Sequence, residues 1–339
     1  MKLICGPMAT ISHPAFRILV EKFGGCDEYF TEMINAGSLM CNGSFEKYYL
    51  NPFPVPEKIV WQLTGRAEEN MTEAARILCE LPGVGLDINM GCCAPDIYRT
   101  GAGISWMLKP IEETKSMVYS IRKVIEENNR MHPESKKRFS VKLRLGDDNF
   151  TDQSFFDFCD MLVDTGVELL TLHPRTKKEK LNRTPRYEYC QKICEKYQKN
   201  GIKIYLNGNV TDASSLNYAL QKAPDVDGVM ISRASVQKPW IFKQLQYEVL
   251  KNYEGKNQIG IDFIQIAEDY IRDVQEYQPQ EFWKTRLQRF FTYYSQNFQF
   301  SHYAQTQFLN AKNIEDLKVR IQEFFEKCPS ERFKTINLN

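Results

Sequence analysis

Eight short apolar segments recur through the first two thirds of the chain, and turn residues bound each of them. They span residues 2–5, 28–31, 58–63, 86–89, 139–144, 168–173, 203–206 and 227–231. Segments with helical spacing separate them, for example over residues 15–23, 72–81, 111–128 and 155–163. Strands that alternate with helices predict a parallel sheet, and eight such repeats predict a closed (β/α)₈ TIM barrel. A doubly wound open sheet is the alternative, although no GxGxxG motif follows the first strand.

The pattern changes after residue 241, where helical periodicity continues and no further strand is expected. In residues 282–297, apolar side chains share one helical face, and Arg286, Arg289 and Tyr293 share another. Residues 313–325 also have helical spacing. The sequence therefore predicts a barrel domain over residues 1–240, a linker over 241–254 and a small all-helical C-terminal domain over 255–339.

Composition excludes several classes of protein. The 339 residues contain no apolar run of about 18, the length that a membrane span needs. The first residues lack the charged-then-apolar layout of a secretory signal. Ten cysteines occur without the spacing of a zinc site, so we expect no metal and a reducing, cytoplasmic environment.

Charge is balanced over the chain but concentrated in one segment. The net charge is +1, from 44 basic and 43 acidic residues, which is not typical of a strongly basic nucleic-acid-binding protein. Residues 175–186 nevertheless contain six cations and one glutamate. Such a segment is equally typical of a solvated loop.

Polar residues gather where the predicted strands end, which is where such barrels carry their active sites. They include Gln62, Asn89, Cys92, Lys142, Arg144, His173, Arg175, Asn207 and Arg233. Each alone is compatible with a satisfied core position, but together they indicate a polar ligand at the barrel mouth, because unpaired buried polar groups are costly. Gly208 and Arg233 follow the last two strands, the usual phosphate site of this fold. Lys142 and Gln62 suit the polar edge of a flavin ring, so FMN fits, as do other phosphorylated ligands.

Residues 87–92 read DINMGC and resemble the DxNxGCP signature of the tRNA-dihydrouridine synthases. Similar segments occur in the family's order, at residues 6–9, 30–33, 62–65, 142–144, 172–176, 207–209, 227–231 and 239–242. The resemblance covers the whole predicted barrel and is followed by a helical tail, as in that family. It implies an FMN-dependent enzyme, driven by NADPH (or NADH), that reduces the C5–C6 bond of uridine in tRNA.

The resemblance also implies roles for particular residues. Cys92 would give a proton to C5 of the uracil while the flavin N5 gives hydride to C6. The residues implied at the cofactor are Gly6, Pro7, Met8, Gln62, Lys142, His173, Asn207, Gly208, Asn209, Ser232 and Arg233. Those implied at the tRNA are Asn89, Arg175, Lys177, Lys178, Lys180, Arg286 and Arg289, although a solvated helix face also explains the last two. The family expectation is a monomer.

Four positions depart from the family pattern, one of them Pro174, which follows His173 where a small residue is common. Cys93 replaces the usual proline and leaves open whether it shares the role of Cys92. Asn209 and Ser232 stand where aspartate and glycine are common. The alternative functions are a small-molecule FMN oxidoreductase of the dihydropyrimidine or dihydroorotate dehydrogenase type, and a non-catalytic RNA-binding protein on the same scaffold. Neither alternative explains the active-site cysteine, the basic segment and the helical tail together.

Overall fold

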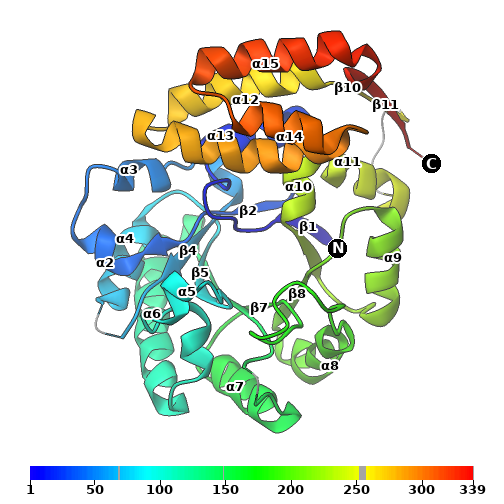
Figure 1. Ribbon diagram of the computed structural model, residues 1–339. Helices are drawn as coiled ribbons and strands as arrows, with labels where there is room; N and C mark the ends of the chain where they lie inside the picture. Colours follow the sequence, from blue (N-terminus) through cyan, green and yellow to red (C-terminus); the bar gives the residue numbers. More distant parts are fainter. Residues whose placement is uncertain (68, 148, 252–256, 339) are drawn as a thin grey trace.

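A closed barrel of eight parallel strands forms the centre of the molecule (Figure 1). The computed structural model describes residues 1–67, 69–147, 149–251 and 257–338. The barrel strands are β1 (Lys2–Cys5), β2 (Glu28–Phe30), β4 (Ile59–Thr64), β5 (Gly85–Met90), β6 (Arg138–Leu143), β7 (Leu169–Leu172), β8 (Lys203–Asn207) and β9 (Gly228–Ile231). Each pairs with its neighbour in parallel, and the pairing of β2 with both β1 and β4 closes the ring. The predicted TIM barrel is confirmed.

Helices surround the barrel and follow the strands in alternation. They are α1 (Pro14–Lys22), α4 (Met71–Glu80), α6 (Ile111–Met131), α7 (Asp152–Asp164), α8 (Glu188–Tyr197) and α9 (Ala213–Lys222). Shorter elements lie in the connections: β3 (Ile34–Asn35), α2 (Ala36–Met40), α3 (Glu46–Tyr49), α5 (Pro95–Tyr98), α10 (Arg233–Gln237) and α11 (Ile241–Leu245). Some of these helices are capped by a side chain, as in the reciprocal capping box of Thr151 and Ser154 at the start of α7.

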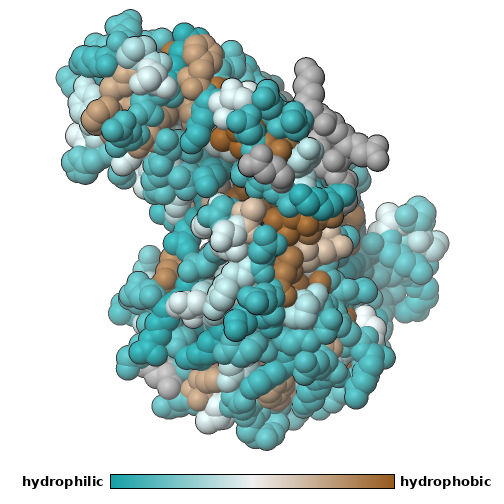
Figure 2. Space-filling view, turned by 90° about the vertical axis from the view of Figure 1, so that its right-hand side faces the viewer, coloured by the Kyte–Doolittle hydropathy of each residue, from teal (hydrophilic) through white to brown (hydrophobic). Residues whose placement is uncertain are grey.

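Four helices form a layer across one edge of the barrel (Figure 1). They are α12 (Phe263–Tyr277), α13 (Gln280–Tyr294), α14 (Ser301–Leu309) and α15 (Ile314–Lys327). Aromatic rings fill their core, among them Tyr270 stacked on Phe290 with centroids 3.7 Å apart. In a side view, this layer is at the top and extends past the barrel on one side (Figure 2). The predicted helical C-terminal region is confirmed.

The expectation that no strand follows residue 241 is wrong. Strands β10 (Gln258–Asp262) and β11 (Phe333–Asn337) pair in antiparallel register beside the helical layer. In β10, Ile259 and Ile261 are buried and alternate with exposed residues, which is a strand pattern too short to stand out among helices. Part of the predicted linker is helical as well: α11 continues into a π-helical turn at Gln246–Leu250.

Alternation along the strands places two kinds of side chain inside the barrel. Ile4, Phe30, Val60, Leu169, Tyr205 and Met230 form one inner apolar cluster. Two residues further along, the inward positions become polar, as at Gln62 and Lys142, because side chains of the same face recur every second residue. The polar inner positions therefore gather at the carboxyl ends of the strands. Within the described residues, no helix has the length and apolar character needed to cross a bilayer.

Candidate active site

A cavity of about 480 Å³ opens at the carboxyl ends of the barrel strands. This volume is within the range of small-molecule and cofactor sites, roughly 300–1,000 Å³. Its walls include nine residues predicted from the sequence: Pro7, Met8, Lys142, His173, Asn207, Gly208, Asn209, Ser232 and Arg233. The structure therefore brings most of the predicted cofactor residues together around one space. Arg144 lines it too, as does Arg289 from the helical layer.

The wall made by β8, β9 and α10 is shaped by two glycines. A side chain at Gly6 would come within 2.3 Å of the Ser232 hydroxyl, so only glycine lets β1 lie this close to the end of β9. Gly208 has φ +130°, a conformation that side chains disfavour, and its carbonyl accepts a hydrogen bond of 2.6 Å from the Tyr187 hydroxyl. Arg233 Nη2 lies 3.3 Å from Asn209 Oδ1. Gly208, Asn209 and Arg233 consequently line the cavity at this end.

A chain of hydrogen bonds links β4, β5 and β6 behind Cys92. Asp87 accepts bonds of 2.7 Å from the Ser140 hydroxyl and 2.8 Å from Gln62 Nε2. Gln62 Oε1 in turn accepts a bond of 2.9 Å from Asn89 Nδ2. These partners meet because Gln62 pairs with Asp87, and Asp87 with Ser140, across adjacent strands. Burial raises the pKa of Asp87 to about 6, although these bonds oppose the shift.

Asn89, the last residue in this series of hydrogen bonds, holds the loop that carries Cys92. Asn89 Oδ1 accepts hydrogen bonds from the backbone N–H of Gly91, at 3.2 Å, and of Cys92, at 2.9 Å. Gln62 and Asn89, predicted at the cofactor and the substrate, therefore use their amides inside the protein. Gln62 is fully buried and does not line the cavity. Their visible role is to position Cys92.

Cys92 is half-buried and fixed from both sides. Its carbonyl accepts a bond of 3.0 Å from Ile104 N–H, and a side chain at Gly103 would come within 2.6 Å of that carbonyl. Burial raises the pKa of the Cys92 thiol above its usual value. The thiol is therefore protonated at neutral pH and can act as an acid. Cys93 is half-buried beside it, and the structure does not separate the two by exposure.

Lys142 and His173 carry different charges in the same cavity. Burial, with help from Arg144, lowers the pKa of Lys142 to about 8, so the amine is mostly protonated at pH 7. It has no hydrogen-bond partner in the described part of the chain. Burial and four neighbouring cations hold the pKa of His173 well below its usual range, so the ring is neutral. Arg175 Nη1 lies 2.8 Å from His173 Nε2, and a guanidinium only donates, so the ring proton is on Nδ1.

Arg175 has a different place from the one predicted. It is fully buried, and its guanidinium bonds the carbonyls of Arg183 and Leu181 as well as His173. Burial lowers its pKa. Arg175 thus holds the loop of residues 176–186 against the barrel, and the prediction of a direct substrate contact is not supported, because the side chain has no exposed surface.

The predicted basic loop, residues 175–186, is held by internal bonds but keeps some cations exposed. Arg144 donates to the carbonyls of Gly91, Thr176 and Lys180, and so joins the Cys92 loop to the basic loop. Lys177 Nζ lies 2.7 Å from Asp147 and over the Tyr98 ring. Lys178 and Lys180, by contrast, are exposed. Of the three lysines predicted at the tRNA, Lys178 and Lys180 are thus exposed, whereas Lys177 is half-buried.

The two arginines predicted on the helical domain separate in the structure. Arg286 is 2% exposed, and its Nη1 lies 2.9 Å from Glu32 Oε2. It anchors α13 to the end of β2, so the prediction of a direct RNA contact is not supported in this conformation. Arg289 is exposed and lines the cavity beside Tyr293 and Gln296. Sequence reasoning placed Arg289 and Tyr293 on one face, but nothing in the sequence indicated that this face meets the barrel mouth.

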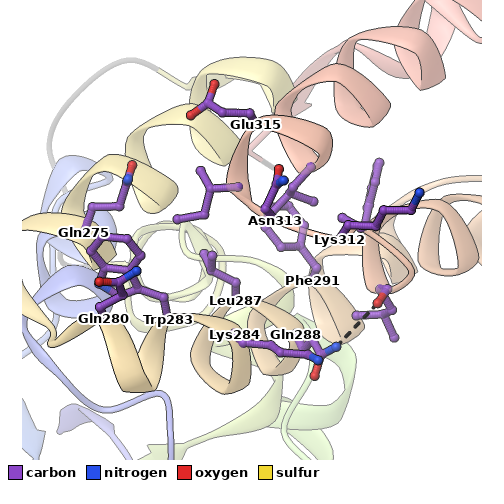
Figure 3. Close-up of a pocket in the computed structure, with 15 residues that line it drawn as sticks. Gln275, Gln280, Trp283, Lys284, Leu287, Gln288, Phe291, Lys312, Asn313 and Glu315 are labelled. Carbon is purple, nitrogen blue, oxygen red and sulfur yellow. Dashed lines mark hydrogen bonds between the residues drawn. The ribbon is translucent and has the colours of Figure 1, made fainter.

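A second pocket, of about 390 Å³, lies within the helical layer, between α12, α13 and the start of α15 (Figure 3). Trp283, Leu287 and Phe291 line it from α13, as does Lys284, and Lys312 lines it from the segment before α15. It contains none of the predicted site residues. The candidate active site is therefore the cavity at the barrel mouth.

Comparisons with known proteins show the family of this chain. The family model described as dihydrouridine synthase matches residues 3–328. A probable tRNA-dihydrouridine synthase of Helicobacter pylori is 29% identical over 250 residues, which are 74% of this chain and 71% of that protein. The tRNA-dihydrouridine synthase B of Klebsiella pneumoniae is 26% identical over 246 residues, or 73% of this chain and 71% of its own. A probable tRNA-dihydrouridine synthase of Aquifex aeolicus is 26% identical over 329 residues, or 96% of each chain. The fold, the cavity and the family match together show that this chain belongs to the dihydrouridine synthase family.

Proposed function

We propose that this protein is a tRNA-dihydrouridine synthase that uses FMN and NADPH. The observation that carries the proposal is a half-buried cysteine, Cys92, whose loop is joined by Arg144 to the wall of a cationic cavity in a chain of this family. Reduction of the C5–C6 bond of uridine needs a hydride at one carbon and a proton at the other. The two halves of the site supply these needs separately.

The cavity residues fit a flavin phosphate. The described residues that line it include Lys142, Arg144, Arg233 and Arg289, but no aspartate or glutamate, so its charge favours an anion. His173 offers Nδ1–H as a neutral donor, and Lys142 offers a positive charge suited to the polar edge of the ring. Bound FMN, reduced by NADPH, would supply the hydride for C6. Asn207, Gly208 and Asn209 would hold the ligand by backbone and amide groups.

Cys92 would complete the reduction by giving its proton to C5. Because Asn89 and Gly103 fix the backbone around it, the thiol is held in place before substrate arrives. Its raised pKa keeps the proton on sulfur until the uracil accepts it. The target uridine must leave the base stack to reach this depth. The exposed Lys178 and Lys180 lie on the loop beside the mouth and would contact phosphates of the RNA.

The test is nucleoside mass spectrometry on unmodified tRNA after incubation with purified protein, FMN and NADPH. We expect a gain of two mass units on uridine, since one hydride and one proton are added. Fragment mapping would then locate the position. A yellow protein that oxidises NADPH but makes no dihydrouridine would instead indicate a small-molecule flavin enzyme. A colourless protein that makes none would indicate an RNA-binding scaffold.

A further inference from the structure

Four residues of the C-terminal segment face the barrel from α13 and the turn that follows it. Arg286, Arg289, Tyr293 and Gln296 recur at helical spacing and therefore share one face. Arg286 is buried in its ion pair with Glu32, while Arg289, Tyr293 and Gln296 line the cavity at the barrel mouth. One wall of the cavity thus comes from the helical layer rather than from the barrel.

The seam between this wall and the barrel is fixed by paired hydrogen bonds. Gln237, at the end of α10, donates from Nε2 to the Gln296 carbonyl at 3.2 Å. Asn297 Nδ2 in turn donates a hydrogen bond of 2.7 Å to the Gln237 carbonyl. Helix α10, which begins at Arg233, also packs against α13. The elements that carry Arg233 and Arg289 are therefore held in a defined relation.

The charges at this end of the cavity are unbalanced. Arg233 has one neutral partner, Asn209 Oδ1, and Arg289 has no hydrogen-bond or ion-pair partner among the described residues, although its guanidinium lies over the Tyr293 ring. No carboxylate lines the described cavity wall. Two guanidinium groups that face one space without a counter-charge favour a dianion such as a phosphomonoester, which both can bind with short, charge-assisted bonds.

We propose that Arg289 is a second ligand of the flavin phosphate, which it binds together with Arg233 across the α10–α13 seam. The proposal rests on the proposed function and deepens it, because it makes the helical domain part of the cofactor site. Arg289 then acts on the cofactor, not on the tRNA as its exposed position first suggests. Arg286, one turn earlier, is a positioning residue that sets the rotation of α13.

The test compares FMN with riboflavin, which lacks the phosphate, by flavin-fluorescence titration of the flavin-free full-length protein. For Arg289→Gln we expect the FMN dissociation constant to rise about 10–100-fold, in line with the loss of one charge-assisted bond. Riboflavin affinity should not change. Arg289→Lys should recover part of the loss, and Lys284→Gln, on the opposite face of α13, should change neither constant.

A parallel titration with tRNA separates the outcomes. The proposal requires that Arg289→Gln keep the tRNA affinity and its salt dependence within about twofold of the wild type. Weaker tRNA binding with unchanged FMN binding would make Arg289 an RNA contact and overturn the proposal. Unchanged binding of both would also overturn it, while leaving the proposed function intact. A wild-type protein that does not bind FMN at all would remove the proposed function together with this inference.

Discussion

The two sides of the barrel mouth differ in whether their polar side chains have partners within the protein. On the β4–β6 side, Asp87, Gln62 and Asn89 satisfy one another and the backbone around Cys92. On the side of β8, β9 and α13, guanidinium groups face the cavity with few partners and no carboxylate within the described wall. The polar groups of the first side are paired within the protein, whereas we propose that an anion pairs those of the second.

This difference shows how stability and function are divided in the site. Buried groups that are paired contribute to folding, because removing one partner leaves the other unsatisfied. Unpaired cations held together lower stability, and their retention indicates a ligand that needs them. Substitutions on the two sides should therefore act in opposite directions on stability, and each side has its own functional readout.

The largest effect is expected at the thiol that the satisfied side positions. Cys92→Ala should lower the rate of dihydrouridine formation about 10²–10⁴-fold, because the proton donor is lost. Flavin binding should be unchanged, since Cys92 is not in the cavity wall. Single-turnover kinetics with tRNA would measure the rate. Cys93→Ala is the matched control and should stay near the wild-type rate, and full activity of Cys92→Ala with an inactive Cys93→Ala would exchange the two roles.

Breaking the satisfied network should cost stability as well as activity. Gln62→Ala leaves Asp87 Oδ2 and Asn89 Nδ2 without their buried partner, so we expect unfolding to become easier by about 2–4 kcal/mol. Urea denaturation monitored by tryptophan fluorescence would measure the change. Gln153→Ala on the surface of α7 should change stability by less than about 0.5 kcal/mol. Equal effects of the two substitutions would show that the network adds nothing to folding.

The opposite sign is expected at Lys142, which belongs to β6 but lines the cavity and has no hydrogen-bond partner among the described residues. Its pKa is about 8 in the fold, below the ordinary lysine value, so the unfolded chain binds more protons between these two values and stability rises with pH across that window. Below pH 8 the charge costs stability in full. Lys142→Met should therefore stabilise the flavin-free protein at pH 7 by about 1–3 kcal/mol, after allowance for partial solvation.

The pH dependence of stability checks the prediction that Lys142→Met stabilises the protein. The gain from Lys142→Met should shrink as pH rises from 8 toward 10.5, because the wild-type amine loses its charge first in the fold. Denaturation curves at pH 7 and pH 9.5 would measure it. Flavin-dependent NADPH oxidation should fall in the same variant. A variant that is less stable than the wild type at both pH values would mean that Lys142 is a satisfied core residue.

The barrel was predictable because the two patterns that indicate it, short apolar strands and helical spacing, are both local in the sequence. Burial of strands and helical spacing can be read within ten or so residues, and the strand ends follow from them. The cavity residues at those ends were predictable for the same reason, since parallel strands bring their carboxyl ends to one side.

The partners of charged residues were not predictable in this way. Arg286 looks like an exposed helical arginine until Glu32, 254 positions away, is placed against it. Arg175 likewise looks available until the loop folds back and its guanidinium bonds the Arg183 carbonyl. Strands β10 and β11 were missed because each is short and its partner is distant in the sequence. Local patterns specify the helices and strands, but the partner of a charged side chain depends on contacts between segments distant in the sequence.

The smallest effect is expected outside the cavity, on the basic loop. Lys177 is unsuitable for the test, because its bond to Asp147 helps to hold the loop. Charge reversal at the exposed pair, Lys178→Glu with Lys180→Glu, should weaken tRNA binding about 3–10-fold and make its salt dependence shallower by about one or two phosphate contacts. The reversal Lys199→Glu with Lys222→Glu, at the other end of the barrel, is the matched control. FMN affinity should not change in either variant. If both double variants weaken tRNA binding equally, the loop attracts RNA only through net charge, and the contacts that orient the tRNA lie elsewhere on the molecule.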